Sequence, residues 1–159
     1  MTRRLLPILL ILVLAAGLAV AGAALWTHPG RALAKLSDAM PGPFSAEVLQ
    51  VVDGDTLEVR VAIWLGQDVV TRVRLLGIDT PELRGKCEAE KVRAAAARDL
   101  LRSLVEGQPV TLRDVSYDKY GGRVLALVSG ADGKPLADRL IAAGLARAYD
   151  GKARGGWCE

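Results

Sequence analysis

The chain has 159 residues, enough for one ordinary domain with an appendage but short for two domains with separate cores. Its formal net charge is +3, and Arg3 and Arg4 supply two of these charges because residues 1–30 contain no acidic side chain. The bulk charge therefore does not indicate a nucleic-acid partner, which has to be argued from a local site. The only histidine, His28, lies outside the predicted folded part, which argues against a histidine nucleophile, a histidine base or a histidine-bound zinc.

The N-terminal segment is strongly apolar. Residues 5–26 contain no charged side chain, and about 20 such residues span a bilayer as a helix. A cleaved signal peptide is the alternative, but its apolar core usually has roughly 7 to 15 residues. We predict that residues 1–26 are a membrane anchor or uncleaved signal. Because Arg3 and Arg4 should stay in the cytoplasm, the following domain is expected on the periplasmic or extracellular side, or secreted if the segment is cleaved.

The sequence contains two cysteines, Cys87 and Cys158. In an exported domain, the oxidising compartment favours a single disulfide between them. Two unrelated thiols are the alternative. Closing a loop of about 70 residues would stabilise the fold by around 4 kcal/mol in the chain-entropy model.

The next residues predict a linker followed by three strands. Residues 27–44 are rich in proline and glycine, which suits a linker, so the folded domain is expected over residues 45–159. Alternating apolar residues predict strands over residues 46–52, 56–65 and 69–76. On the second strand the apolar positions are Leu57, Val59, Val61 and Ile63. The short turn at residues 53–55 makes the three strands an antiparallel meander.

In the second half of the domain, the spacing of apolar residues changes from that of a strand to that of a helix. Residues 88–106 predict a helix, whose expected buried stripe is Ala89, Val92, Ala96, Leu100 and Leu104. Strands are expected at residues 110–115 and 123–128, and a short helix at 136–143. The expected fold class is therefore α+β and mainly β: a five-stranded OB-fold barrel with a helix after the third strand and a short C-terminal helix, preceded by an N-terminal transmembrane helix.

Carboxylates and arginines carry the predicted chemistry. Asp55 lies at the first turn of the meander and Asp79 at the end of its third strand, so both are expected at one rim, where they suit a hard cation such as Ca²⁺ or Mg²⁺. Glu82 is placed to deprotonate a nearby water, while Arg74 and Arg123 suit phosphate oxygens. Each cluster alone is typical of a turn. Their combination in this order indicates a phosphoryl-transfer site.

Residues 45–149 resemble the staphylococcal nuclease-like thermonucleases. The resemblance rests on VDGDT at 52–56, RLLGIDTPE at 74–82, DKYG at 118–121 with Arg123, and AGLA at 143–146. It implies an OB barrel and Ca²⁺-dependent hydrolysis of DNA and RNA phosphodiesters to 3′-phosphate ends, by metal-assisted in-line attack of water. It implies no protein partner.

The resemblance also implies a role for each matching residue. One Ca²⁺ would be held by Asp55, Asp79 and the Thr80 main-chain carbonyl, with Glu82 acting on the attacking water. The substrate would be bound by Arg74 and Arg123 at the scissile phosphate, by Lys119 and Tyr120 at a neighbouring phosphate, and by Tyr149 packing on a nucleotide.

The sequence departs from the family pattern at three places, the first of which is a stretch between Glu82 and the predicted helix that is shorter than in the staphylococcal enzyme and removes a flexible loop near the substrate. An extra glycine precedes Arg123, which keeps its place only if the added residue bulges outward. The sequence also stops at Glu159 without the long C-terminal helix of the staphylococcal enzyme. A disulfide between Cys87 and Cys158 is expected to fasten residues 151–157 over the predicted helix instead.

Two other functions are weighed against a nuclease. A non-catalytic OB module that binds single-stranded nucleic acid or another polyanion would need a basic groove with exposed stacking aromatics, but aromatic residues make up only 4% of the chain. A structural envelope protein that reuses the fold would show no metal-dependent stabilisation. Neither alternative explains the full set of carboxylates and arginines.

Overall fold

A computed structural model describes residues 38–158. These residues belong to one compact unit, Ser37–Glu159. The predicted membrane anchor, residues 1–26, lies outside the described residues. Within residues 38–158, no helix is long and apolar enough to cross a membrane.

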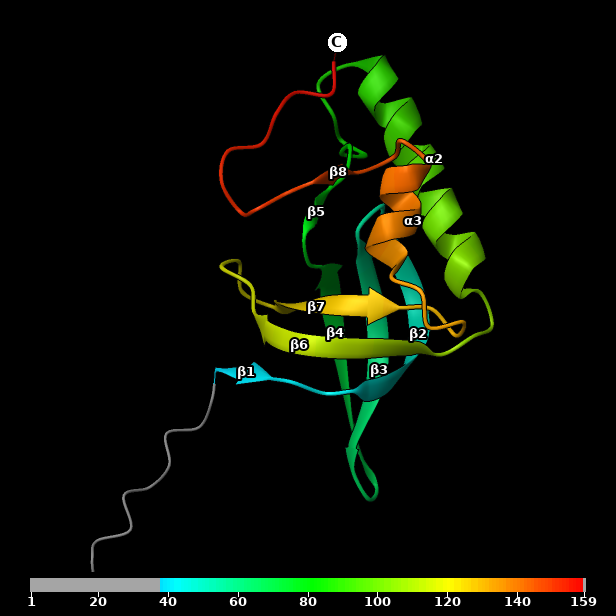
Figure 1. Cartoon of the computed structure of the whole chain (residues 1–159), viewed down its shortest axis with the longest axis vertical. Coiled ribbons are helices and arrows are strands. Elements are labelled where there is room, and N and C mark those ends of the chain that lie inside the picture. Colours follow the sequence, from blue (N-terminus) through cyan, green and yellow to red (C-terminus); the bar gives the residue numbers. More distant parts are fainter. Residues whose placement is uncertain (1–37, 159) are drawn as a thin grey trace, which may run out of the picture. The chain divides into compact units, whose positions relative to one another are not determined.

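Five strands form a closed barrel (Figure 1). The strands β2 (Phe44–Asp53), β3 (Thr56–Trp64) and β4 (Gln67–Leu75) make the predicted antiparallel meander. After a helix, β6 (Val110–Tyr117) pairs with β2, and β7 (Arg123–Ser129) pairs in parallel with β4. The β6–β7 pairing closes the ring, so no edge of these five strands remains open along its full length. The mainly β barrel expected from the strand pattern is confirmed.

The predicted linker is too long at its C-terminal end. A two-residue strand, β1 (Ala39–Met40), pairs with β6, and β2 already begins at Phe44. The last residues of the range 27–44 therefore belong to the sheet. The prediction failed here because proline and glycine, which are typical of linkers, are also tolerated beside a short edge strand.

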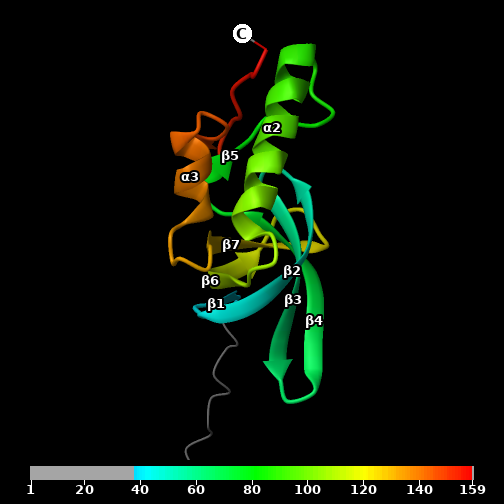
Figure 2. The same ribbon diagram turned by 90° about the vertical axis from the view of Figure 1, so that its right-hand side faces the viewer.

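The meander alternates as expected inside the barrel but not beyond it. Leu57, Val59 and Val61 are buried together with Val73 of β4. Ile63 was expected to share this face, yet it is half exposed. Figure 2 shows why: the β3–β4 hairpin continues past the other strands, and its tip has no second layer to cover it.

The helix α2 (Glu88–Val105) forms where predicted but buries a different face. Its buried residues are Glu90, Ala94, Ala97, Leu101 and Val105, whereas Ala89, Val92 and Ala96 of the predicted stripe are exposed and Leu100 and Leu104 are only partly buried. The run of four alanines at residues 94–97 suits either face equally. Tertiary contacts decide between them, because the Glu90 carboxylate accepts hydrogen bonds from the backbone N–H groups of Glu82 (3.3 Å) and Lys86 (2.9 Å).

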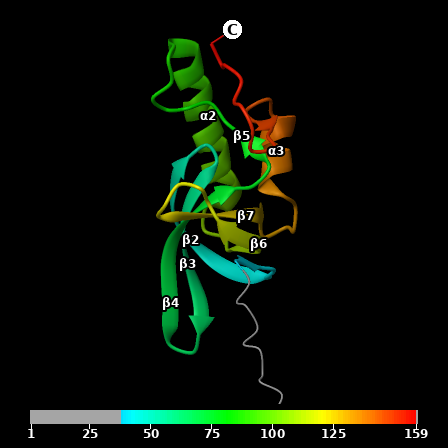
Figure 3. The same cartoon turned by 90° about the vertical axis from the view of Figure 1, so that its left-hand side faces the viewer.

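The C-terminal segment returns to the region after β4. Beyond α3 (Leu136–Ala142), the strand β8 (Arg147–Ala148) pairs with β5 (Ile78–Asp79), and the backbone N–H of Tyr149 donates to the Gly77 carbonyl at 2.9 Å. Figure 3 shows the last residues running along β5 to the N-terminal end of α2. There Cys158 forms a disulfide with Cys87, with Cα atoms 5.8 Å apart. The pairing predicted for the two cysteines is present in the structure.

Candidate active site

The turn between β2 and β3 is held from two sides. The backbone N–H of Leu75, at the end of β4, donates to the Asp55 carbonyl at 2.8 Å. On the other side α2 packs so closely that a Cβ on Gly54 would lie 2.8 Å from the Cβ of Ala97, which explains why a glycine precedes Asp55. Asp55 is consequently fixed near the end of β4, with only 2% of the residue exposed.

Asp55 is a buried carboxylate that faces an arginine. Arg74 approaches its Oδ2 at 2.6 Å, and the Thr56 hydroxyl donates to its Oδ1 at 2.8 Å. Burial raises the pKa of the Asp55 carboxyl, while Arg74 and Thr56 act in the opposite direction without cancelling the rise. Burial likewise raises the pKa of the neighbouring Asp53. Negative charge is therefore costly at this turn unless a cation is close.

Asp79, the second buried carboxylate, is surrounded by groups from the C-terminal segment. Its Oδ2 accepts hydrogen bonds from the Trp157 indole N–H at 3.1 Å and from Arg147 at 3.3 Å. Its Oδ1 accepts one from the Nε of Arg154 at 2.5 Å. Because β5 pairs with β8, the chain that carries these donors lies directly beside Asp79.

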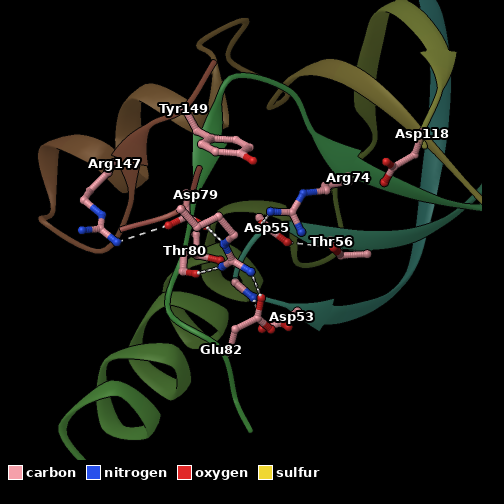
Figure 4. Close-up of polar contacts among 12 residues, drawn as sticks. Asp53, Asp55, Thr56, Arg74, Asp79, Thr80, Glu82, Asp118, Arg147 and Tyr149 are labelled. Carbon is pink, nitrogen blue, oxygen red and sulfur yellow. Dashed lines mark hydrogen bonds and ion pairs between the residues drawn. The ribbon is translucent and has the colours of Figure 1, made fainter. Parts of the chain in front are cut away.

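The guanidinium of Arg154 binds three groups at the end of β5 and just after it. Besides Asp79, its guanidinium donates to the Glu82 Oε1 at 2.5 Å and to the Thr80 carbonyl at 3.0 Å. Burial alone would lower the pKa of Arg154, but the bonds to Glu82 and the charge of Asp79 outweigh it and raise the pKa. Figure 4 shows Asp79, Thr80, Glu82 and Asp55 arranged around the same small region.

Arg123 begins β7 and is engaged by a neighbouring acid. Its Nε is bonded to the Asp118 carboxylate, and its guanidinium lies 5.2 Å from the centre of the Tyr120 ring. Slight burial would raise the pKa of Asp118, but the bonds from Arg123 and Tyr120 lower it. The extra glycine before Arg123, Gly122, has φ +83°, which closes the turn so that Arg123 still lines the pocket described next.

A pocket of about 1200 Å³ lies over these groups. Among the predicted residues, its lining contains Arg74, Glu82, Lys119, Tyr120, Arg123 and Tyr149. Six basic side chains line it in all: Arg72, Arg74, Lys119, Arg123, Lys152 and Arg154. The structure thus brings the predicted phosphate-binding and nucleotide-binding residues to one concave surface, with Asp55 and Asp79 buried outside its lining.

The predicted metal ligands fit Ca²⁺ in chemistry. All three are oxygen atoms, two of them on carboxylates that are 2% exposed, and hard cations prefer such donors. Guanidinium groups contact both carboxylates, which shows that the region stabilises positive charge. Within residues 38–158, the ligand atoms of Asp55, Asp79 and Glu82 do not all lie within 4.8 Å of one another. Those of Cys87, Glu90 and Cys158 do, but the two sulfurs are joined in the disulfide.

The sequence-based prediction missed the contribution of the C-terminal segment. Arg147, Arg154 and Trp157 all contact Asp79. A signal was available, since the expected pairing of Cys158 with Cys87 places residues just before Cys158 near the end of the 74–82 motif. Tyr117 was also missed: it is 78% exposed, and together with Tyr120 and Tyr149 it puts all three tyrosines of the chain on the pocket.

Comparison with known proteins identifies the family of the chain. A family model described as "Staphylococcal nuclease homologue" matches residues 72–155, more than half of the chain. Two proteins named "Uncharacterized endonuclease", from Escherichia coli and Escherichia coli O157:H7, are each 33% identical to it over 103 residues. These residues make up 65% of this chain and 60% of each relative.

Proposed function

The chain belongs to the staphylococcal nuclease homologues, and from that premise we propose that it is an exported, Ca²⁺-dependent endonuclease that hydrolyses DNA or RNA to 3′-phosphate ends. The observation that carries the proposal is the placement of Glu82 and Arg74 on one basic pocket, next to buried Asp55 and Asp79. Nuclease activity in general is supported by the family match and by the two relatives named endonuclease.

The metal site would consist of Asp55, Asp79 and the Thr80 carbonyl. A bound Ca²⁺ would supply positive charge next to the scissile phosphate and lower the pKa of a nearby water. Mg²⁺ fits less well, because it demands a stricter octahedral arrangement than these groups, drawn from the β2–β3 turn and from the end of β5, are expected to offer.

Glu82 is the proposed general base. Its carboxylate, on the pocket surface, would accept a proton from the water that attacks phosphorus. The new P–O bond would form in line with the bond to the 5′ oxygen; that bond would break, the 5′ oxygen would take up a proton from solvent, and the phosphate would stay on the 3′ end. Arg74 and Arg123 would stabilise the charge that builds on the phosphoryl oxygens, and Arg123 must then exchange Asp118 for phosphate.

The rest of the pocket would hold the neighbouring nucleotides. Lys119 and Tyr120 lie beside each other, with the ammonium 5.2 Å from the ring centre, and suit an adjacent phosphate. Tyr149 and the exposed Tyr117 offer ring faces to bases, which stack on aromatic side chains without regard to sequence. This mode of binding fits a nuclease of low sequence specificity.

The proposed location rests on the N-terminal sequence and on the disulfide. The uncharged residues 5–26 suit a membrane anchor, and the disulfide between Cys87 and Cys158 is the kind of bond that persists outside the cytoplasm. Protease treatment of intact cells that express the full chain tests this location. Digestion of the domain only after the cell envelope is opened to the periplasm, or directly from outside, supports export.

Cleavage of single-stranded DNA and of RNA by the oxidised full chain, in Ca²⁺ or in EDTA, tests the activity. We expect Ca²⁺-dependent cleavage and 3′-phosphate ends detectable by mass spectrometry of the products. Glu82→Gln should lower kcat by about 10²-fold or more, the usual contribution of a general base, while Ca²⁺ binding stays intact. The control is Glu88→Gln, an exposed residue on α2, which should not change the rate. An unchanged rate in the Glu82 variant would refute the assigned base.

A non-catalytic nucleic-acid module is the second candidate. The observation in its favour is the pocket itself, since three tyrosines and six basic side chains would bind a single strand without any chemistry. The same experiment separates the two functions. Binding of DNA by the folded protein without cleavage in Ca²⁺ would favour the module over the enzyme.

A further inference from the structure

Arg154 is bonded to the same oxygen atoms that the proposed function assigns to the metal and the base. Its three nitrogens donate to the Asp79 Oδ1, the Thr80 carbonyl and the Glu82 Oε1, at 2.5, 3.0 and 2.5 Å. Two of these oxygens belong to proposed Ca²⁺ ligands. One monovalent guanidinium therefore neutralises the part of the site where a divalent cation is expected.

A guanidinium and Ca²⁺ cannot share these atoms. Ca²⁺ binds its oxygen ligands at about 2.3–2.6 Å, so a cation held by Asp79 Oδ1 and the Thr80 carbonyl would lie within a few ångströms of Arg154. Two cations at such a separation in a half-buried site repel each other strongly, because the low local dielectric constant screens them poorly. One must leave before the other binds.

We propose that Arg154 occupies the metal end of the active site and that Ca²⁺ binds by displacing it, so that Arg154 sets the Ca²⁺ affinity of the site. The inference rests on the proposed function, because it takes Asp79 and Thr80 as metal ligands. Arg154 lines the pocket, so its side chain has open space into which it can withdraw.

The surrounding chain keeps Arg154 close to the site. On its C-terminal side, Trp157 is buried and bonded to Asp79, and Cys158 is tied to α2 by the disulfide. Arg147 donates to the carbonyls of Gly155 and Gly156 and stacks on Trp157, with its guanidinium carbon 3.8 Å from the ring centre. These contacts give Arg154 a high local concentration at the carboxylates, which strengthens its competition with free Ca²⁺.

The chain on the N-terminal side of Arg154 is more loosely held. Asp150, Gly151 and Lys152 are exposed, and the hydrogen bonds and ion pair that Asp150 and Lys152 form lie within residues 149–152. Displacement of Arg154 therefore requires a change in one side chain and a short exposed loop, while residues 155–158 keep their contacts.

Isothermal titration of Ca²⁺ into the oxidised full chain in a nonionic detergent tests the inference. If Arg154 blocks the site most of the time, the apparent Kd for Ca²⁺ equals the intrinsic Kd divided by the fraction of molecules whose site is open. Arg154→Gln removes the block and is therefore expected to lower the apparent Kd by roughly tenfold or more. The matched control is Arg93→Gln, which makes the same substitution at an exposed residue of α2 that does not line the pocket. Its Kd should change by less than about twofold, since exposed charges are largely screened.

An NMR measurement provides a readout that does not depend on affinity. In EDTA the Arg154 Nε–H signal, assigned by its loss in Arg154→Lys, should be protected from exchange with water. Added Ca²⁺ should shift that signal and remove its protection at the same concentration that saturates the titration.

The possible outcomes separate the inference from the function on which it rests. If the wild-type chain binds Ca²⁺ and Arg154→Gln binds it equally or more weakly, the inference is overturned and the metal site stands. If neither protein binds Ca²⁺, the proposed metal dependence fails as well. Tighter Ca²⁺ binding by Arg154→Gln, with that of Arg93→Gln unchanged, supports the competition.

Discussion

The carboxylate of Asp55 shows how a single residue couples stability to the proposed chemistry. Burial raises its pKa even though Arg74 lies 2.6 Å away. A raised carboxyl pKa means that the folded state binds a proton more tightly than the unfolded state does. Its contribution to stability is therefore largest below the ordinary pKa of 3.8 and is lost as the pH rises through the folded-state pKa.

Replacing Asp55 by Asn should remove this loss. In EDTA, we expect the Tm of Asp55→Asn to exceed that of the wild type at pH 7, with the difference shrinking as the pH approaches 4, because the amide does not ionise and its oxygen still accepts from Arg74. Thermal unfolding across pH 4–7 measures this. Asp68→Asn, on the exposed β3–β4 hairpin, is the control. A variant whose Tm follows the wild-type pH dependence would contradict the assignment. The same substitution should weaken Ca²⁺ binding.

At the scale of elements, α2 shows that the spacing of apolar residues does not by itself predict which face of a helix is buried. The helix packs on the barrel through Leu101 and Val105, while Val92 of the predicted stripe is 61% exposed. The interaction of Glu90 with the backbone at Glu82 and Lys86 helps to select this face. The same bonds connect the helix to the loop that carries the proposed base.

Paired substitutions on α2 distinguish the two faces. Leu101→Ala should lower the free energy of unfolding by about 2–5 kcal/mol, because it opens a cavity in a fully buried position. Val92→Ala should change it by less than about 0.5 kcal/mol, as surface substitutions usually do. Chemical denaturation of both variants gives the comparison. Equal losses in the free energy of unfolding would mean that α2 packs on the barrel through a different face from the one described.

At the scale of the molecule, the Cys87–Cys158 disulfide joins the end of the domain to its middle. It closes a loop of 71 residues that includes α2, β6, β7 and α3. Because Trp157 and Cys158 are adjacent, the bond also keeps the C-terminal segment next to Asp79.

Replacing both cysteines by alanine should lower the free energy of unfolding by about 4 kcal/mol in the chain-entropy model. Denaturation of the oxidised full chain in guanidinium chloride measures the loss. The single variants Cys87→Ala and Cys158→Ala should each match the double variant, because either one breaks the same bond. A loss below about 1 kcal/mol in all three would show that the segment is held by its other contacts.

Local sequence patterns predicted the five barrel strands and both helices, but not the short strands β1, β5 and β8. Strict alternation marked β3 and β4, and turn residues marked their ends, because these signals arise between neighbours in the chain. Arg74 and Arg123 lie on strands where the meander and barrel closure were expected to bring them. Asp79, expected at the end of the third strand, lies instead in the separate strand β5, which pairs with β8.

Only the tertiary structure decided which face α2 buries and what the C-terminal segment does. Four consecutive alanines contain no directional signal, so the face follows from contacts with other elements. Arg154 likewise reads as an ordinary charged residue in a glycine-rich stretch, and it reaches Asp79, 75 positions away, only through the β5–β8 pairing and the disulfide. Periodicity reports interactions within an element, whereas the electrostatics of this site depend on charges that distant segments bring together.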